Sequence, residues 1–538
     1  MRKNKVLTKA LSVLLCAAMV VSATGCGKKK GGSNEIDLKQ ISYAMETIEG
    51  ITGRICAIDP AGDMVYVATS ESEDMTEYPE GYDEDAASDS VLTEEEQEIE
   101  YKYVNTIHLY SLTPEGKDVK ELFSEQLEDN WALDDLTVLP DKTLVCLYSG
   151  YNEETESTEC MLQMFGEDGK KGSGVSLNDF FDDPSYAYVQ DLTSDQDGNI
   201  VMQADDKILV VDREGKELLR LTVNGYINSI CRDKSGKIVA CVNEEDGVSV
   251  KTVDMASKGF TKTTMAAGTI NRLLTGYGSY DYCVEAGQGI DGADYSGNRN
   301  AVLNWVGSNI EGQYINQITS LGDGNFMAYF YEYSEDEDQE TLIRLRKMDP
   351  SEVENRQVVV YGGTYISEDI TKEAIKFNRS QSKYQIVIRD YSSFDDPEGK
   401  MNSDLLAGDV PDIIDMAYLP EEKYIGKGLL MDLYPLMEND TEVKKEDFFE
   451  NVLKTLESNG KLYRIAPTYQ LSLLAGSKED VGDKTNIQIG DLMELEKKYK
   501  DSKAFSSDST KETVLSTLCM NMFDSFVDWD SGKCSFDS

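Results

Sequence analysis

The sequence predicts a multidomain protein in which an all-β propeller of about six blades precedes an α/β domain. Short apolar strands joined by Gly and Asp turns recur between residues 42 and 349 at a spacing of about 40 residues, which is typical of propeller blades. No long amphipathic helix precedes residue 366. After a polar linker at residues 350–357, strands alternate with helices, which indicates a mostly parallel sheet.

The first 25 residues have the pattern of an export signal. Four basic residues precede an apolar run from Ala10 to Ala23, which is too short to span a membrane. The following Ala23-Thr24-Gly25-Cys26 resembles the lipobox of bacterial lipoproteins, which implies lipidation of Cys26 and anchoring at the outer face of the cell membrane. Cleavage after Ala23, with release of a secreted protein, is the alternative. Residues 26–41 then form a flexible tether.

The repeats of residues 42–349 are clearest in three segments, at 188–221, 226–254 and 314–333, and weaker copies surround residues 59–64, 140–144 and 276–284. A four-stranded blade cannot bury both of its faces alone, so several blades packed around an axis explain the repetition. Two stacked β-sandwiches are the structural alternative. Residues 71–100 hold 14 acidic and no basic residues and are expected to form a solvated insertion in a blade. A calcium trap is the other interpretation, although the spacing lacks calcium-loop geometry.

Charge and residue usage narrow the function. The formal charge of −48 argues against a nucleic-acid partner, because phosphate binding needs clustered Lys and Arg. The single histidine, His108, lies in a strand-like segment and is expected to be structural. No metal site, cofactor or enzymatic activity is expected, because a chain with one histidine has too few for a multi-His metal site and little basis for a Ser-His-Asp triad. No C-x-x-C pair occurs, and apolar neighbours of Cys146 and Cys241 favour buried free thiols.

The elements of the α/β part can be predicted in order. Residues 358–361 form an apolar strand that Gly362-Gly363 ends, and a helix with Ser367 as its N-cap follows, because apolar residues from Ile366 to Phe377 recur at helical spacing. A strand at 384–389, a helix at 401–407 and a strand at 412–415 come next. Apolar residues between 448 and 456 give a further helix, which Asn459-Gly460 is expected to close.

Aromatic and polar residues follow each of the three predicted strands. Ligands of open parallel sheets bind beyond the carboxyl ends of the strands, so these loops are the candidate site. Aromatic rings stack on the apolar faces of sugars, and carboxylates accept hydrogen bonds from sugar hydroxyls. The candidate ligand-binding residues are therefore Tyr365, Tyr391, Asp415 and Tyr418.

The α/β part also resembles a family of solute-binding proteins of ABC importers, family 1, which capture sugars between two lobes. The resemblance rests on Phe377-Asn378, residues 407–414, residues 428–433 and residues 460–467. It implies a periplasmic-binding-protein-like domain at 358–538, with a first lobe at 358–469 and the start of a second lobe at 470–538. It further implies ligand contacts from Tyr469, Gln470, Asp508 and Trp529. Met416 stands where related sugar binders often have a Trp, and Tyr418 is expected to replace it.

These expectations combine into a membrane-anchored lipoprotein that captures a carbohydrate or oligosaccharide by lobe closure and delivers it to ABC permease subunits. No Walker-type loop occurs, so ATP hydrolysis is assigned to another subunit. The domain is expected to be incomplete, because the chain ends within the second lobe. Two rivals are a non-transport surface receptor or adhesin whose propeller binds the ligand, and a glycoside-active propeller enzyme.

Overall fold

The computed structural model describes most of the chain between residues 36 and 466 and short pieces beyond it. The described residues are 36–76, 102–128, 130–152, 157–181, 188–245, 247–266, 270–333, 339–394, 396–466, 477–482, 489–499, 510, 527–528 and 533–534. The chain divides into two compact units, Met1–Pro467 and Thr468–Ser538.

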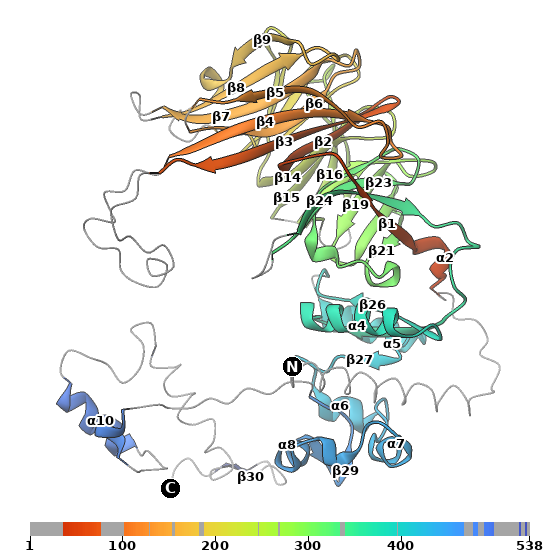
Figure 1. Ribbon diagram of the computed structural model, residues 1–538. Helices are drawn as coiled ribbons and strands as arrows, with labels where there is room; N and C mark the ends of the chain where they lie inside the picture. Colours follow the sequence, from red (N-terminus) through yellow and green to blue (C-terminus); the bar gives the residue numbers. More distant parts are fainter. Residues whose placement is uncertain are drawn as a thin grey trace. The chain divides into compact units, whose positions relative to one another are not determined.

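Six four-stranded antiparallel sheets form the propeller (Figure 1). Blade B contains β2 (Arg54–Ala61), β3 (Met64–Asp74), β4 (Tyr103–Leu112) and β5 (Lys120–Gln126), and blade C contains β6 (Trp131–Val138), β7 (Leu144–Asn152), β8 (Ser157–Phe165) and β9 (Lys171–Ser176). Blade D contains β10 (Asp191–Ser194), β11 (Ile200–Ala204), β12 (Lys207–Val211) and β13 (Glu217–Thr222), and blade E contains β14 (Tyr226–Arg232), β15 (Ile238–Glu244), β16 (Gly247–Asp254) and β17 (Gly259–Met265). Blade F contains β18 (Arg272–Thr275), β19 (Tyr282–Ala286), β20 (Gly289–Ala293) and β21 (Arg299–Asn304).

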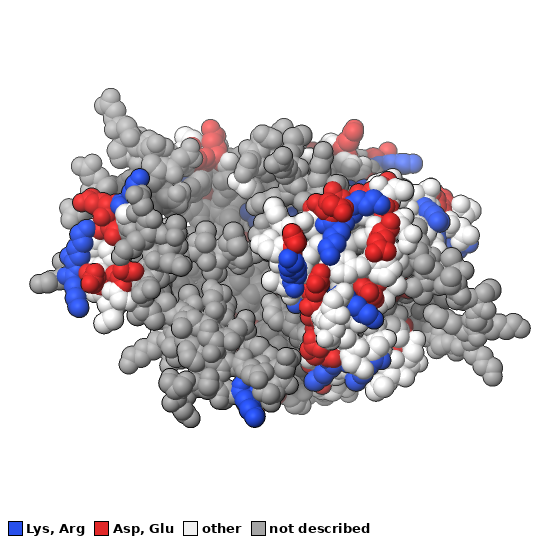
Figure 2. Space-filling model, turned by 90° about the horizontal axis from the view of Figure 1, so that it is seen from below, with Lys and Arg blue, Asp and Glu red and all other residues white. Residues whose placement is uncertain are grey.

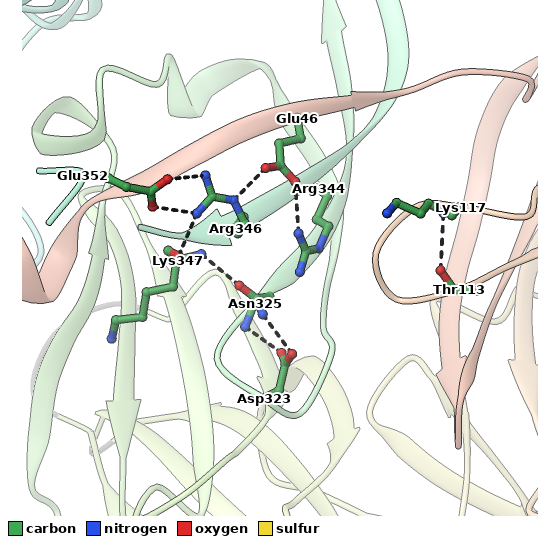
Figure 3. Close-up of polar contacts among 9 residues, drawn as sticks. All are labelled: Glu46, Thr113, Lys117, Asp323, Asn325, Arg344, Arg346, Lys347 and Glu352. Carbon is green, nitrogen blue, oxygen red and sulfur yellow. Dashed lines mark hydrogen bonds and ion pairs between the residues drawn. The ribbon is translucent and has the colours of Figure 1, made fainter. Parts of the chain in front are cut away.

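Blade A closes the ring by joining the two ends of the propeller sequence. Its strand order is β1 (Tyr43–Ile48), β24 (Gln339–Lys347), β23 (Phe326–Glu332) and β22 (Ile315–Ser320). Glu46 on β1 accepts hydrogen bonds from Arg346 Nε at 2.6 Å and Arg344 Nη1 at 3.0 Å, both on β24 (Figure 3). Burial acts to raise the pKa of Glu46, but the two guanidinium groups hold it below its usual value. The pairing of β1 with β24 is therefore reinforced by ion pairs between the same two strands.

Six hydrophobic clusters hold the ring together, and each cluster joins two neighbouring blades. Apolar side chains on both faces of each sheet are thus buried, which accounts for the repeated apolar strands. The turns that end the first strands of blades D and E are tight, with Gly198 at φ 81° and Gly236 at φ 83°. Six cysteines of the propeller, at 56, 146, 160, 231, 241 and 283, are free, and Cys146 and Cys241 are buried as predicted.

A three-stranded parallel sheet of order β26-β25-β27 follows the propeller. Its elements are β25 (Gln357–Gly363), α4 (Glu368–Ser380), β26 (Tyr384–Asp390), α5 (Pro397–Ala407) and β27 (Ile413–Ile414). Ser367 caps α4, as predicted, by accepting from the Ile370 N–H. Three short helices come next: α6 (Glu421–Gly426), α7 (Tyr434–Asn439) and α8 (Glu450–Leu456).

Figure 2 shows acidic and basic side chains interspersed over the described residues of one face.

The end of α8 differs from the expectation. Glu457 is the residue that ends the helix, and Asn459-Gly460 instead turns a hairpin between β28 (Glu457–Ser458) and β29 (Lys461–Leu462). Both turn residues have positive φ, 51° and 73°, which is the geometry that an Asn-Gly hairpin turn requires. An Asn-Gly pair fits a helix end and a hairpin equally well, and the pairing partner decides between them.

The segment expected to be a tether contains a packed helix, α2 (Leu38–Ile41). Leu38 and Ile41 are buried in one cluster with Val387, and Val358 and Val360 pack against it. Because side chains alternate along a strand, α2 covers one face of the parallel sheet and α4 covers the other, where Val359 is buried. Leu38–Ile41 is therefore packed rather than part of a flexible tether, and this helix connects the propeller sequence to the sheet.

A loop of the propeller also packs on the sheet. The loop contains η4 (Val306–Ser308), and Val306 belongs to the same cluster as Val359. Gln385 Nε2 donates to Gly307 O at 3.1 Å, and Asn378 Nδ2 donates to Val306 O at 3.2 Å. Both amide side chains are buried. The propeller is thus joined to the α/β part by packing and by buried hydrogen bonds.

The second unit is described only in short pieces. These are α9 (Lys478–Val481), α10 (Ile489–Lys498), and a pair of antiparallel strands, β30 (Val527–Asp528) and β31 (Lys533–Cys534). Among the described residues of the whole chain, no helix is long and apolar enough to cross a membrane.

Candidate ligand-binding site

Two exposed tyrosines meet where β25 and β27 end. The strands are parallel neighbours, so the loops that follow them start at the same edge of the sheet. The rings of Tyr365 and Tyr418 lie 6.2 Å apart between centroids in an edge-to-face arrangement at 83°. Their exposed fractions are 54% and 85%. Two aromatic surfaces are thus offered to solvent side by side.

Glycines and hydrogen bonds hold these two loops together. A Cβ on Gly363 would lie 2.6 Å from the Asp415 Cβ, so this close approach requires glycine. Asp415 Oδ1 accepts from the Ala417 N–H at 2.9 Å, and Thr364 Oγ1 donates to Ala417 O at 3.4 Å. The loop after β27 is therefore anchored to the loop after β25.

Tyr418 has an unusual backbone conformation. Its φ is 62°, a left-handed value that costs an ordinary residue about 1–2 kcal/mol. Neighbouring Met416 packs towards a buried cluster around Tyr391 and Met401, while the Tyr418 ring faces solvent. Strained residues of this kind are concentrated at ligand sites. Since a strained residue presents an exposed ring here, Tyr418 is the strongest single candidate for ligand contact.

Asp415 is held by a second tyrosine beneath the site. Tyr361 donates its hydroxyl proton to Asp415 Oδ2 at 2.9 Å. Burial and the nearby Asp415 charge raise the pKa of Tyr361, so the phenol remains neutral and keeps donating. This partner was not identified from the sequence, although Tyr361 lies two residues before the Gly363 contact. The Asp415 side chain is half-buried, and a hydrogen bond to each of its two carboxylate oxygens fixes its orientation.

The structure brings three of the candidate residues together, Tyr365, Asp415 and Tyr418. It does not bring Tyr391 to this surface, because that side chain is 2% exposed and its hydroxyl donates to Asp404 Oδ2 at 3.2 Å. The phenol packs on Phe394 within a buried cluster. The four remaining candidates, Tyr469, Gln470, Asp508 and Trp529, and the lipidation candidate Cys26 lie outside the described residues.

A second polar assembly surrounds the propeller axis and was missed by the sequence reasoning. Asp59 Oδ1 accepts from Arg232 Nη2 at 2.5 Å, although blades B and E lie on opposite sides of the six-blade ring. Asp135 Oδ2 accepts from the Leu192 N–H, and Asp191 Oδ2 accepts from the Ile230 N–H, both at 2.9 Å. Asp135 and Asp191 thus each bond the first strand of the next blade, and Asp59 does the same by accepting from the Val138 N–H at 2.7 Å. Only a recurring Asp at one place in the repeat could have signalled this.

Two of the axis carboxyl groups have raised pKa values. Burial raises the pKa of Asp191 to about 6, and burial together with the Asp191 charge raises that of Asp135 well above its usual value. Among the described residues, no group of three or more His, Cys, Asp or Glu could hold a metal ion. The hydrogen bonds of Asp59, Asp135 and Asp191 join neighbouring blades around the axis.

Replacing Asp191 with asparagine should change how stability depends on pH. A carboxyl whose pKa is raised on folding binds more protons in the folded state, so its contribution to stability falls as pH rises from about 4 to about 6. Asparagine cannot titrate but still accepts from the Ile230 N–H. Urea unfolding measures the free energy of unfolding at pH 5 and at pH 7. Between these pH values it should fall by less in the variant than in the wild type. Equal losses in wild type, Asp191→Asn and the exposed control Asp197→Asn would contradict this origin.

Comparisons with known proteins found similarity to solved structures alone. No protein-family model and no curated protein matches the chain. Solved structures that resemble it include the β-propeller domain of the Trilobed protease from Pyrococcus furiosus, with 11% identity, coverage of 54% of this chain and 80% of that one, and a TM-score of 0.28. A calcium-binding regucalcin from Agrobacterium tumefaciens has 13% identity, coverage of 46% and 86%, and a TM-score of 0.31. At this level the similarity concerns the fold alone, and the chain is a six-bladed propeller joined to an α/β part.

One expectation from the sequence is corrected by these comparisons. A puromycin hydrolase complexed with PGG also matches, with 11% identity, coverage of 68% of this chain and 70% of that one, and a TM-score of 0.33. The prediction that the protein is not an enzyme is therefore wrong as a general exclusion, because enzymes are among the proteins whose structures resemble it. The scarcity of histidine removes only histidine-based mechanisms.

Proposed function

We propose that the chain is the ligand-capturing lipoprotein of an ABC importer, anchored through Cys26 at the outer face of the cell membrane. Its ligand is a carbohydrate or oligosaccharide, and residues 358–469 form the first lobe of a solute-binding domain that closes on it. The observation that carries the proposal is the exposed pair Tyr365 and Tyr418 at the adjacent ends of β25 and β27. Two rings beside an oriented carboxylate suit a sugar, which has apolar C–H faces and hydroxyl donors.

The arrangement of elements supports the same function. The two rings lie at the edge of a parallel sheet where ligands of open α/β sheets bind. Asp415 is fixed by Tyr361 and by the Ala417 N–H before any ligand arrives, so little side-chain entropy is lost on binding. In such a domain, lobe closure follows ligand binding, and the closed form engages the permease subunits.

Replacing Tyr418 with alanine should weaken sugar binding by about tenfold, because loss of one stacking ring costs about 1 kcal/mol or more. The measurement is calorimetric titration of the full chain against a panel of soluble oligosaccharides. Phe449→Ala is the matched control, since Phe449 is an exposed aromatic residue at the start of α8. Absence of saturable binding across the panel, or equal weakening by both substitutions, would contradict the proposed site.

The alternative is a non-transport surface receptor whose propeller binds the ligand. Sugar binding that survives both Tyr418→Ala and Tyr365→Ala would favour this alternative, because it would place the ligand away from the α/β part.

A further inference from the structure

The exposed large apolar side chains of the propeller are gathered at one end of it. Among described propeller residues, eight such side chains are exposed, and all but Met45, which lies within β1, are at this end. The other seven form what we call the tyrosine face: Met75, Tyr103, Tyr151, Tyr188, Tyr226, Met265 and Tyr333. Tyrosine and methionine account for the whole set.

Strand pairing places all seven at the same end. Tyr226 is the first residue of β14, and Tyr188 lies three residues before β10. Tyr103 pairs with Asp74 at the tips of β4 and β3, and Asp74 lies four residues beyond Ser70, which pairs with Arg54 at the start of β2. In each antiparallel blade, the second and fourth strands end on the side where the first strand starts. The remaining side chains lie at or just after such strand ends, so they are on the same side of the ring. The opposite end of the ring carries the turns between first and second strands.

The tyrosine face covers successive blades. Tyr333 belongs to blade A, Tyr103 to blade B, Tyr151 to blade C, Tyr188 to blade D and Tyr226 to blade E. First strands of neighbouring blades contact one another around the ring in this order, so the residues form an arc over five blades. The Tyr226 hydroxyl accepts from Asn243 Nδ2 at 2.8 Å, which holds that ring in place. Exposed apolar groups that gather in this way mark interaction surfaces.

The charge at this end is acidic. Exposed carboxylates lie after β1, near the end of β3, after β5 and after β15, at Glu49, Glu73, Glu128 and Glu245. Exposed basic side chains at the same end include Arg54 and Lys102. An acidic surface of this kind favours cationic partners over nucleic acids and anionic lipid surfaces.

We infer that the tyrosine face binds a basic polypeptide. Tyrosine and methionine are enriched in protein interfaces, and tyrosine gives large contact area at low entropic cost. Lysine and arginine side chains are attracted both to aromatic rings and to the surrounding carboxylates. The methionines favour a polypeptide over a polysaccharide, since thioethers offer no flat face for sugar stacking. This inference does not depend on sugar binding at Tyr365 and Tyr418.

Fluorescence anisotropy with a labelled nine-residue oligolysine peptide tests it on the full chain. The variant that removes four rings, Tyr103→Ala, Tyr151→Ala, Tyr226→Ala and Tyr333→Ala, should weaken binding by tenfold or more. A second variant, with Glu73→Gln, Glu128→Gln and Glu245→Gln, removes three carboxylates of the face and should weaken binding by at least threefold. Its matched control, with Glu115→Gln, Asp197→Asn and Glu214→Gln, removes three exposed carboxylates at the opposite end and should leave binding within twofold of the wild type.

The outcomes separate the inference from non-specific attraction. Equal weakening by the two charge variants, with no effect of the tyrosine substitutions, would overturn it, because any acidic surface would then bind the peptide. Binding of neutral polysaccharide by the tyrosine face, with no peptide binding, would also overturn it. Unchanged circular dichroism of each variant shows that the blades remain folded.

Discussion

Replacing Asp59 with alanine should lower the free energy of unfolding of the propeller by about 3–5 kcal/mol, because it leaves a partly buried arginine without its counter-ion. Asp59 serves three donors: Arg232 Nη2 at 2.5 Å, the Val138 N–H at 2.7 Å and Thr137 Oγ1 at 2.9 Å. Two of these donors lie on the neighbouring blade and the third lies across the ring. The side chain is only 12% exposed, so water cannot replace the lost carboxylate at each donor.

Urea unfolding followed by far-ultraviolet circular dichroism measures this effect. Asp63→Ala is the control, since Asp63 pairs with Lys142 in an exposed turn four residues away, where ion pairs contribute little. The control should lie within about 0.5 kcal/mol of the wild type. A loss of under about 1 kcal/mol for Asp59→Ala would show that the axis pair does not hold the blades together.

Replacing Asn378 with alanine should have the second largest effect, a loss of about 3 kcal/mol where the propeller loop meets the sheet. The amide is fully buried and makes three hydrogen bonds: to Val306 O at 3.2 Å, to Ile386 O at 3.0 Å, and from the Ile386 N–H at 2.7 Å. Alanine removes the side-chain partner of the Ile386 N–H and C=O, while Val306 O still accepts from Gln385 Nε2 and the Asn309 N–H. We therefore expect the α/β part to open before the propeller unfolds.

Limited proteolysis combined with thermal unfolding detects this order. In the variant, cleavage between residues 357 and 466 should quicken, while the propeller remains resistant. Ser380→Ala is the control on the same helix, because the Ser380 hydroxyl is exposed and bonds only locally, to Phe377 O at 2.8 Å. Equal resistance of the Asn378→Ala protein would show that packing alone joins the two parts.

The site was partly predictable because strand ends are visible in the sequence. Gly362-Gly363 and the residues after Ile414 mark the ends of two strands, and parallel strands end at one edge, so Tyr365, Asp415 and Tyr418 could be placed together. Tyr391 follows the third strand in the same manner, yet its ring packs among Phe394 and Met401. Burial of a side chain depends on which residues surround it in space, and no local pattern states that.

Local order was predictable where a single turn or cap determines it. The six-blade repetition, the Ser367 cap and the alternation of strands and helices after residue 357 could be predicted, because turn glycines, capping groups and apolar periods act over a few residues. Three features could not be predicted: β1 closes the last blade, α2 covers the parallel sheet, and Asp59 meets Arg232 across the ring. These pairings join residues far apart in the chain, and they depend on shape and charge that appear only once the blades have packed.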